Sequence, residues 1–494
     1  MSPMTTRAPS RASRRAVCLP IPDAPPVTRA TLPISLCMSS PALLFAPILS
    51  QRRAGSDRDM RAPRCAVRSG RVRDDFANLV QVELERPMFR YDPFSSEAMA
   101  DPHRFYPELR ADHPAYRLAE YHGWAIPRFA DCWQVLQDHD RFSVVEGPVF
   151  TQELVRKPFE AESLNRASPQ LSFGIWDPPH HTRIRRTMTS FFSPKRIESL
   201  EGDMRRLARD LLEDLVPRGT FDVVGDLAGP YALGNICRVL NLELDALPEL
   251  FKLIQRSTAR TPGVPGFTAV GMEAQAQIHP RICEAVLSRP VCDTLEGGDI
   301  ASALAGFEFD GVPLCEADVA TQLFTLMLGG AETVPKVIAG GLLELAHQPE
   351  QWRALVRDPG LVPVAFEEMM RHQGPLQHVG RTLLDDVEIA GEAMKRGDRV
   401  FLLLQSANRD DREFRDGENF DIHREPRRNL AFGIGRHHCI GSHLARLEGR
   451  VLLETFLEFV GEYGVREREV LRPGSEFQVG VTRLPVEISP TLPR

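Results

Sequence analysis

The most constraining feature of this chain is a glycine-rich approach to one cysteine, followed directly by an apolar helical repeat. Within residues 430–446, Gly433, Gly435 and Gly441 surround Cys439. Cys439 therefore precedes a helix N-terminus, where the dipole and free N–H groups favour a thiolate. Glycine lets the backbone pass close to a flat ligand and donate N–H groups to the sulfur. The helical repeat consists of Leu444, Leu447, Val451, Leu452 and Phe456.

Three plainer interpretations of this segment need weighing. A lone buried cysteine is most often a small hydrophobic residue. His437, His438 and Cys439 could form part of a zinc site, but contiguous ligands cannot close a tetrahedral site without distant partners. Gly433 and Gly435 alone are too short for a dinucleotide-binding fingerprint, and no strand precedes them. The ten residues from Phe432 to Gly441, taken together, argue against all three interpretations.

The segment resembles the haem-binding loop of the cytochrome P-450 family. The family pattern Phe-x-x-Gly-x-x-x-Cys-x-Gly is met by Phe432, Gly435, Cys439 and Gly441. The resemblance implies that Cys439 is the thiolate ligand of the iron of haem b. A thiolate ligand pushes electron density toward the iron and favours O–O cleavage.

The resemblance also assigns cofactor-binding roles to neighbouring residues of the loop. It implies that His437 contacts a haem propionate and that the ring of Phe432 packs beside the sulfur. Gly433 is expected in the stretch of backbone that approaches the haem.

A second segment resembles the propionate-binding region of soluble bacterial members of this family. From Asp177 to Arg186 the chain reads DPPHHTRIRR, which matches the family's Asp-Pro-Pro-x-His-x-x-x-Arg and is expected to open a helix. The resemblance implies that His181 and Arg185, spaced i,i+4, present two cations to one propionate. Arg381 matches the family's other propionate-binding arginine. Each residue taken alone could instead be a solvated basic side chain.

Glu368 and Arg371 lie in a helix predicted over residues 362–372, where their i,i+3 spacing places both charges on one face. The pair resembles the family's Glu-x-x-Arg, and Arg424 matches its expected partner. An ordinary surface ion pair, worth roughly 0–1 kcal/mol, is the alternative. The implied role of the three residues is structural and not catalytic.

A long helix predicted over residues 316–347 carries the sequence LGGAETVP, ending at Pro335. It resembles the family's oxygen-binding groove, with Glu332 as the catalytic acid and Thr333 as the catalytic alcohol. Within a helix Gly costs about 1 kcal/mol and Pro about 3 kcal/mol relative to Ala, so a plain helix would not select them. The alternative is a kinked core helix in which Glu332 is paired elsewhere.

The remaining patterns indicate a fold that is mostly α with small β-sheets, in one large unit. A further helix is predicted over residues 193–216, and strands over residues 387–389, 399–403 and 479–488. Residues 75–494 are expected to form the catalytic domain. Residues 1–74 are rich in Arg, Pro and Ser without helical or strand periodicity. They are interpreted as a disordered or mis-assigned N-terminal extension, with a transit peptide as the alternative.

Composition limits the class of protein further. Of the net charge of −7, residues 1–70 contribute +8 and the rest −15, so the acidic body gives no reason to expect nucleic acid. The nine cysteines include no CxxC pair and indicate reduced thiols in a cytoplasm. No uninterrupted apolar run of about 18 residues is present, so no stable membrane anchor is predicted.

The resemblance implies a monooxygenase that inserts one oxygen atom of O₂ into an apolar small molecule. A ferredoxin or flavodoxin with an NAD(P)H reductase would supply electrons, and Arg183, Arg186 and Arg446 are candidate contacts for an acidic ferredoxin. The alternatives are a peroxygenase or isomerase acting on a peroxide, and a non-catalytic haem-binding sensor. Substrate-facing segments are expected at residues 144–174, 262–267, 377–379 and 477–481.

Overall fold

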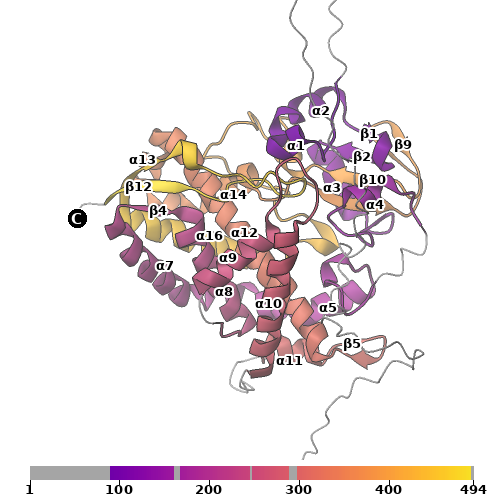
Figure 1. Cartoon of the computed structure of the whole chain (residues 1–494). Helices are drawn as coiled ribbons and strands as arrows, with labels where there is room; N and C mark the ends of the chain where they lie inside the picture. Colours follow the sequence, from indigo (N-terminus) through magenta and orange to yellow (C-terminus); the bar gives the residue numbers. More distant parts are fainter. Residues whose placement is uncertain (1–88, 161–166, 245–246, 289–297, 491–494) are drawn as a thin grey trace, which may run out of the picture.

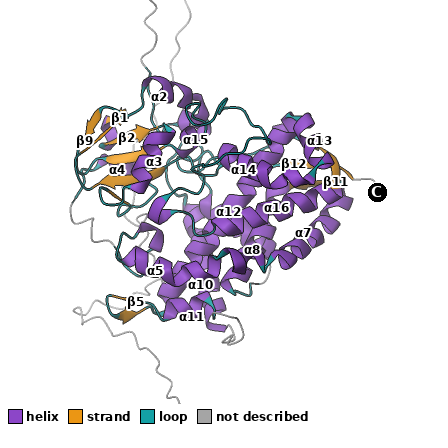
Figure 2. Cartoon of the chain, turned by 180° about the vertical axis from the view of Figure 1, so that it is seen from behind, coloured by secondary structure: helices purple, strands orange, loops and turns teal. Residues whose placement is uncertain are grey.

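The computed structural model describes residues 89–160, 167–244, 247–288 and 298–490. The predicted N-terminal extension, residues 1–74, lies outside these ranges. Helices form the greater part of the described chain, and most of the strands gather at one side of the helical body (Figures 1 and 2). The predicted class, mostly α with small sheets, is confirmed.

The longer helices build the body of the fold. They are α2 (Tyr106–Asp112), α3 (Phe129–Gln137), α5 (His180–Thr189), α7 (Glu201–Leu215), α8 (Gly229–Leu240), α9 (Leu247–Thr258), α10 (Ala269–Ser288), α12 (Glu316–His347), α13 (Pro349–Arg357), α14 (Val362–Gln373) and α16 (Ser442–Phe459). The shorter helices are α1 (Ser96–Ala100), α4 (Gln152–Arg156), α6 (Pro194–Glu198), α11 (Ile300–Ala305) and α15 (Leu404–Ala407).

The largest sheet has the strand order β1-β2-β10-β7-β3, and all its neighbours are antiparallel except β2 and β10. A second sheet has the order β11-β12-β4, and two hairpins pair β5 with β6 and β8 with β9. The strands are β1 (Tyr116–Leu118), β2 (Gly123–Ile126), β3 (Phe142–Ser143), β4 (Thr220–Asp222), β5 (Glu308–Phe309), β6 (Val312–Pro313), β7 (Val379–Leu383), β8 (Val387–Ile389), β9 (Glu392–Met394), β10 (Arg399–Leu402), β11 (Val460–Val465) and β12 (Pro485–Pro490).

Helix α12 runs through the helical body and packs against α8, α10 and α14 (Figure 1). Small residues allow the close approach: a Cβ atom on Gly330 would lie 2.8 Å from Ile236 of α8. Another on Gly341 would collide with Met369 of α14. The helix is long and apolar enough to cross a membrane, but most of its apolar stretch is buried inside the protein. It is therefore the core helix of this fold.

Two sequence-based elements differ from the structure. The helix predicted over residues 193–216 is broken, because the Ser199 hydroxyl donates to the Arg196 carbonyl at 2.6 Å and α6 ends there. The strand predicted over residues 479–488 begins only at Pro485. Before it, Gln478 forms an isolated bridge with Leu376, and Gly480 has a φ of 108°. The other predicted elements are confirmed within one residue at their ends.

Candidate active site

A cavity of about 350 Å³ lies between α12, α5 and the loop that carries Cys439. Its wall is largely apolar and is formed from segments far apart in the sequence. Apolar side chains that line it include Ile236, Leu326, Val337, Met370, Leu376 and Val379.

Cys439 lines this cavity, and its exposed surface faces the interior space. The Cys439 N–H donates to the Phe432 carbonyl at 2.9 Å, which closes the loop, and α16 begins three residues later at Ser442. Burial raises the pKa of the Cys439 thiol, whereas the Gly441 N–H and the charges of Arg185 and Arg446 lower it. The thiolate thus has three sources of stabilisation within its own chain.

Four basic side chains line the cavity together. The rings of His181 and His437 stack with centroids 4.0 Å apart. Arg185 donates to the carbonyl of His438, and Arg381 donates to the carbonyl of Gly380 at 2.7 Å. Burial lowers the pKa of Arg381 to about 10, that of His181 to about 4 and that of His437 to about 2.

This cluster fits a bound dianion. Both ring nitrogens of His181 are buried without a hydrogen-bond partner among the described residues. Arg381 is buried as well, and buried cations require paired anions. Two propionates would supply that charge while the Cys439 sulfur faces the same cavity, so the residues present suit haem b. Among the described residues, no group of three or more His, Cys, Asp or Glu suits a metal ion held by protein ligands alone.

Helix α12 presents Gly329 and Thr333 to the cavity. The Thr333 hydroxyl donates to the Gly329 carbonyl at 2.9 Å, and space beside Gly329 is open. A hydroxyl tied to the preceding turn in this way is held in a fixed orientation at the cavity wall.

Glu332, expected as the catalytic acid, does not line the cavity, whereas Thr333 does. Its carboxylate accepts from Lys336 at 2.6 Å and from Gln478 at 2.8 Å, and also from Thr258 at 2.5 Å. Burial alone would raise the pKa of Glu332, but these three partners lower it below its usual range. Glu332 is therefore paired elsewhere, as the plainer interpretation of this helix expects.

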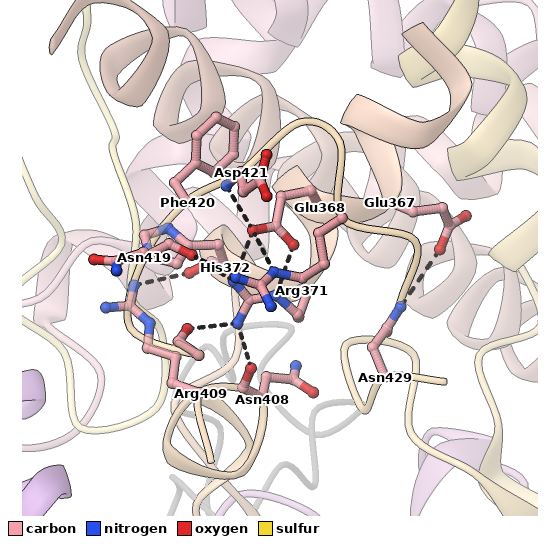
Figure 3. A network of polar contacts seen from close by, with 12 residues as sticks. Glu367, Glu368, Arg371, His372, Asn408, Arg409, Asn419, Phe420, Asp421 and Asn429 are labelled. Atoms are coloured by element: carbon pink, nitrogen blue, oxygen red, sulfur yellow. Dashed lines mark hydrogen bonds and ion pairs between the residues drawn. The ribbon is translucent and has the colours of Figure 1, made fainter. Parts of the chain in front are cut away.

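Glu368 and Arg371 form a fully buried, bidentate pair behind the cysteine loop, with both N–O distances 2.7 Å (Figure 3). Arg424 also donates to Glu368, at 3.2 Å. Arg371 further donates to the carbonyls of Asn408 and Gly417 at 2.6 and 2.7 Å. The surface ion pair weighed as the alternative is excluded by this burial, and none of the three charged residues lines the cavity.

Not every segment expected to face the substrate reaches the cavity. Val144, Phe173 and Gly174 line it, whereas residues 262–267 and 477–481 contribute nothing to its wall. His378, which precedes β7, does not line the cavity, and its ring contacts those of Phe401 and Phe477. The Arg183 guanidinium donates to the Glu308 carbonyl at 2.9 Å.

Two features of the site were missed from the sequence. Glu448 of α16 is buried in the cavity wall, and burial raises the pKa of its carboxyl well above the usual range. A glutamate on the apolar face of the helix after Cys439 was the available signal. His139, in the turn after α3, accepts from the Arg436 N–H at 2.8 Å and supports the cysteine loop, but no local pattern marked it.

Comparison with known proteins gives a consistent result. A family model described as cytochrome P450 matches residues 361–462. The chain is 31% identical to the 20-oxo-5-O-mycaminosyltylactone 23-monooxygenase of Streptomyces fradiae, over 75% of this chain and 84% of that protein. It is 29% identical to the linalool 8-monooxygenase of Pseudomonas putida, over 82% of this chain and all of that protein.

Solved structures agree with these relatives. Cytochrome P450 CYP109Q5 from Chondromyces apiculatus superposes with a TM-score of 0.68 and 29% identity, covering 81% of this chain and 98% of that one. A mutant of P450 EryK in complex with erythromycin B superposes with a TM-score of 0.69 and 26% identity, covering 81% and 99%. Sequence and fold together show that this chain belongs to the cytochrome P450 family, as a haem b oxidoreductase.

Proposed function

We propose that this chain is a haem-thiolate monooxygenase that inserts one oxygen atom of O₂ into an apolar small molecule. The observation that carries the proposal is one apolar cavity lined both by Cys439 of the glycine-rich loop and by Thr333 of α12. Residues 75–494 form the catalytic domain in this proposal. One named relative acts on linalool and the other on 20-oxo-5-O-mycaminosyltylactone. Because these compounds differ, the proposed substrate class rests on the apolar wall of the cavity.

Each residue of the cavity then has a distinct task. Cys439 ligates the iron, and His181, Arg185, Arg381 and His437 hold the propionates. Gly433, with a φ of 60°, turns the backbone toward the cofactor, and Phe432 packs beside the sulfur. The bound haem supplies the chemistry of O₂ activation.

Proton delivery is assigned to α12. The Thr333 hydroxyl has acceptor lone pairs beyond its bond to Gly329 and can orient water in the cavity. Glu332 is held as an anion by Lys336 and can carry a proton only after it leaves that partner. A rotation of Glu332 toward Thr333 is therefore part of the proposed cycle.

Electrons are proposed to come from a ferredoxin or flavodoxin with an NAD(P)H reductase, in a cytoplasmic setting. Arg186 is the candidate contact for an acidic partner, and Arg446 is a weaker one because it already donates to the Glu367 carboxylate. Arg183 is a weaker candidate, because its guanidinium already donates to the Glu308 carbonyl.

A peroxide-driven enzyme is the second candidate, favoured by one observation: Glu332 does not line the cavity. The test compares oxidation of a terpene such as linalool under two conditions. In one, a surrogate ferredoxin, its reductase, NADPH and O₂ drive the protein; in the other, hydrogen peroxide does so without O₂ or reductant. Product formed only in the first condition supports the monooxygenase. Equal or greater product in the second would replace it with a peroxygenase.

A further inference from the structure

An ion pair lies behind the cysteine loop, outside the cavity. Arg446, in the second turn of α16, donates to the carboxylate of Glu367 on α14 through both Nε and Nη2. The Nη2 bond is 3.4 Å long. The same carboxylate accepts from the Asn429 side chain at 3.4 Å (Figure 3). Glu367 therefore joins α14 to α16 and to the segment that leads into the cysteine loop.

Arg446 in turn contacts the ring beside the sulfur. Its Cζ atom lies 4.6 Å from the centre of the Phe432 ring, a cation–π distance. Phe432 accepts the Cys439 N–H through its carbonyl oxygen at 2.9 Å. The ring of Phe432 thus connects the positive charge of Arg446 to the loop that carries the Cys439 sulfur.

We propose that Glu367 is a positioning residue that sets the reduction potential of the haem by holding Arg446 on Phe432 and partly neutralising it. The proposal rests on Cys439 being the haem ligand. A positive charge near the iron stabilises an added electron, so Arg446 raises the potential and Glu367 offsets that effect. The side chains of Arg446 and Glu367 are 41% and 26% exposed, so solvent reduces the size of both effects but not their direction.

The chain offers a matched control on the same helix. Arg450 lies one turn beyond Arg446 on α16 and pairs with Glu201 at 2.6 Å and Glu454 at 3.2 Å. Its side chain is 30% exposed, close to the exposure of the Glu367–Arg446 pair. Within the described ranges, it has no ring contact with Phe432. Arg450→Gln therefore removes the same charge from the same helix without touching the loop.

The experiment is a spectroelectrochemical titration of the purified, substrate-free holoenzyme and its variants. Glu367→Gln keeps an acceptor for Arg446 but removes the negative charge, so the midpoint potential should rise. Arg446→Gln should lower it, and the double variant should lie between the two. Arg450→Gln should leave it unchanged. Arg446→Lys, which keeps the charge without the planar contact, should fall between wild type and Arg446→Gln.

Two failures are distinguishable. If wild type and variants all show a thiolate-type spectrum with carbon monoxide, but Glu367→Gln and Arg446→Gln leave the potential unchanged or move it in the same direction, the inference is wrong. A shift as large in Arg450→Gln also overturns it, since the effect would then be one of general surface charge. A wild type without the thiolate-type spectrum instead removes the proposed role of Cys439.

Discussion

Lys336 lies one turn after Glu332 on α12, and its Nζ donates to Glu332 Oε1 at 2.6 Å. Both side chains are buried. The pair lies on the helix that borders the cavity, beside Thr333. Because the partners of Glu332 lower its pKa, the carboxylate remains ionised near neutral pH. Oε1 of Glu332 also accepts from Thr258, and Oε2 accepts from Gln478. A buried ion pair is costly to break by removing one member.

Replacing Lys336 should therefore destabilise the fold. Lys336→Met leaves the Glu332 carboxylate buried without its cation, with an expected loss of about 3–5 kcal/mol in the free energy of unfolding. Urea unfolding of the purified protein measures it. The control is Lys395→Met, which breaks the solvent-exposed pair with Asp386. Equal losses in the free energy of unfolding would show that the buried Lys336–Glu332 pair stabilises the fold no more than the exposed pair does.

Thr333→Ala should uncouple electron consumption from product formation. A positioned proton donor typically contributes about 10²–10⁴-fold, so product per NAD(P)H should fall at least about 10-fold while peroxide rises. Thr321→Ala is the control, since this α12 threonine makes the same bond to the preceding turn, at 3.0 Å to Ala317, but does not line the cavity. Unchanged coupling in Thr333→Ala would remove Thr333 from proton delivery.

Glu368→Gln should weaken the structure behind the cysteine loop. The substitution leaves the fully buried Arg371 without a counter-charge, at an expected cost of about 3–5 kcal/mol, and should reduce the haem retained per protein. Thermal unfolding and the haem-to-protein absorbance ratio measure the two effects. Glu413→Gln, which breaks the more exposed pair with Arg428, is the control. Full haem retention and stability in Glu368→Gln would contradict the structural role.

His378 should make folding stability depend on pH. Burial lowers its pKa from 6.5 to about 3, so between those values the unfolded chain binds one more proton than the folded one. Stability then falls as pH falls through this window, by up to about 1.4 kcal/mol per pH unit. His378→Phe should reduce that slope by one proton in urea unfolding from pH 7 to pH 4. A slope in His378→Phe that is unchanged from that of the wild type would refute the assignment.

Features set by short stretches of sequence were predictable. The glycine positions around Cys439, the long helix over residues 316–347 and the i,i+3 spacing of Glu368 and Arg371 each depend on residues close together in the sequence. The geometry of the local backbone determines which of these residues lie on the same face of a helix or turn. The structure confirms that the three patterns form the loop, the core helix and the buried pair.

Features that depend on distant partners were not predictable in this way. Glu332 is held by Gln478, 146 residues further along the chain, and no local pattern links the two. The stretch before Pro485 has strand-like composition but forms only two isolated bridges in the described chain, Gln478 with Leu376 and Arg483 with Leu471, and no continuous ladder. Strand formation depends on pairing more than on intrinsic preference, so composition alone misplaced the start of β12.

The central claim is that Cys439 supplies a thiolate to haem iron, and one absorption spectrum tests it most directly. The purified, dithionite-reduced protein is saturated with carbon monoxide and compared with Cys439→Ala. The account predicts a Soret band well to the red of histidine-ligated haem in wild type and its loss in the variant. A histidine-type band in wild type, or a thiolate-type band that survives in Cys439→Ala, would contradict it.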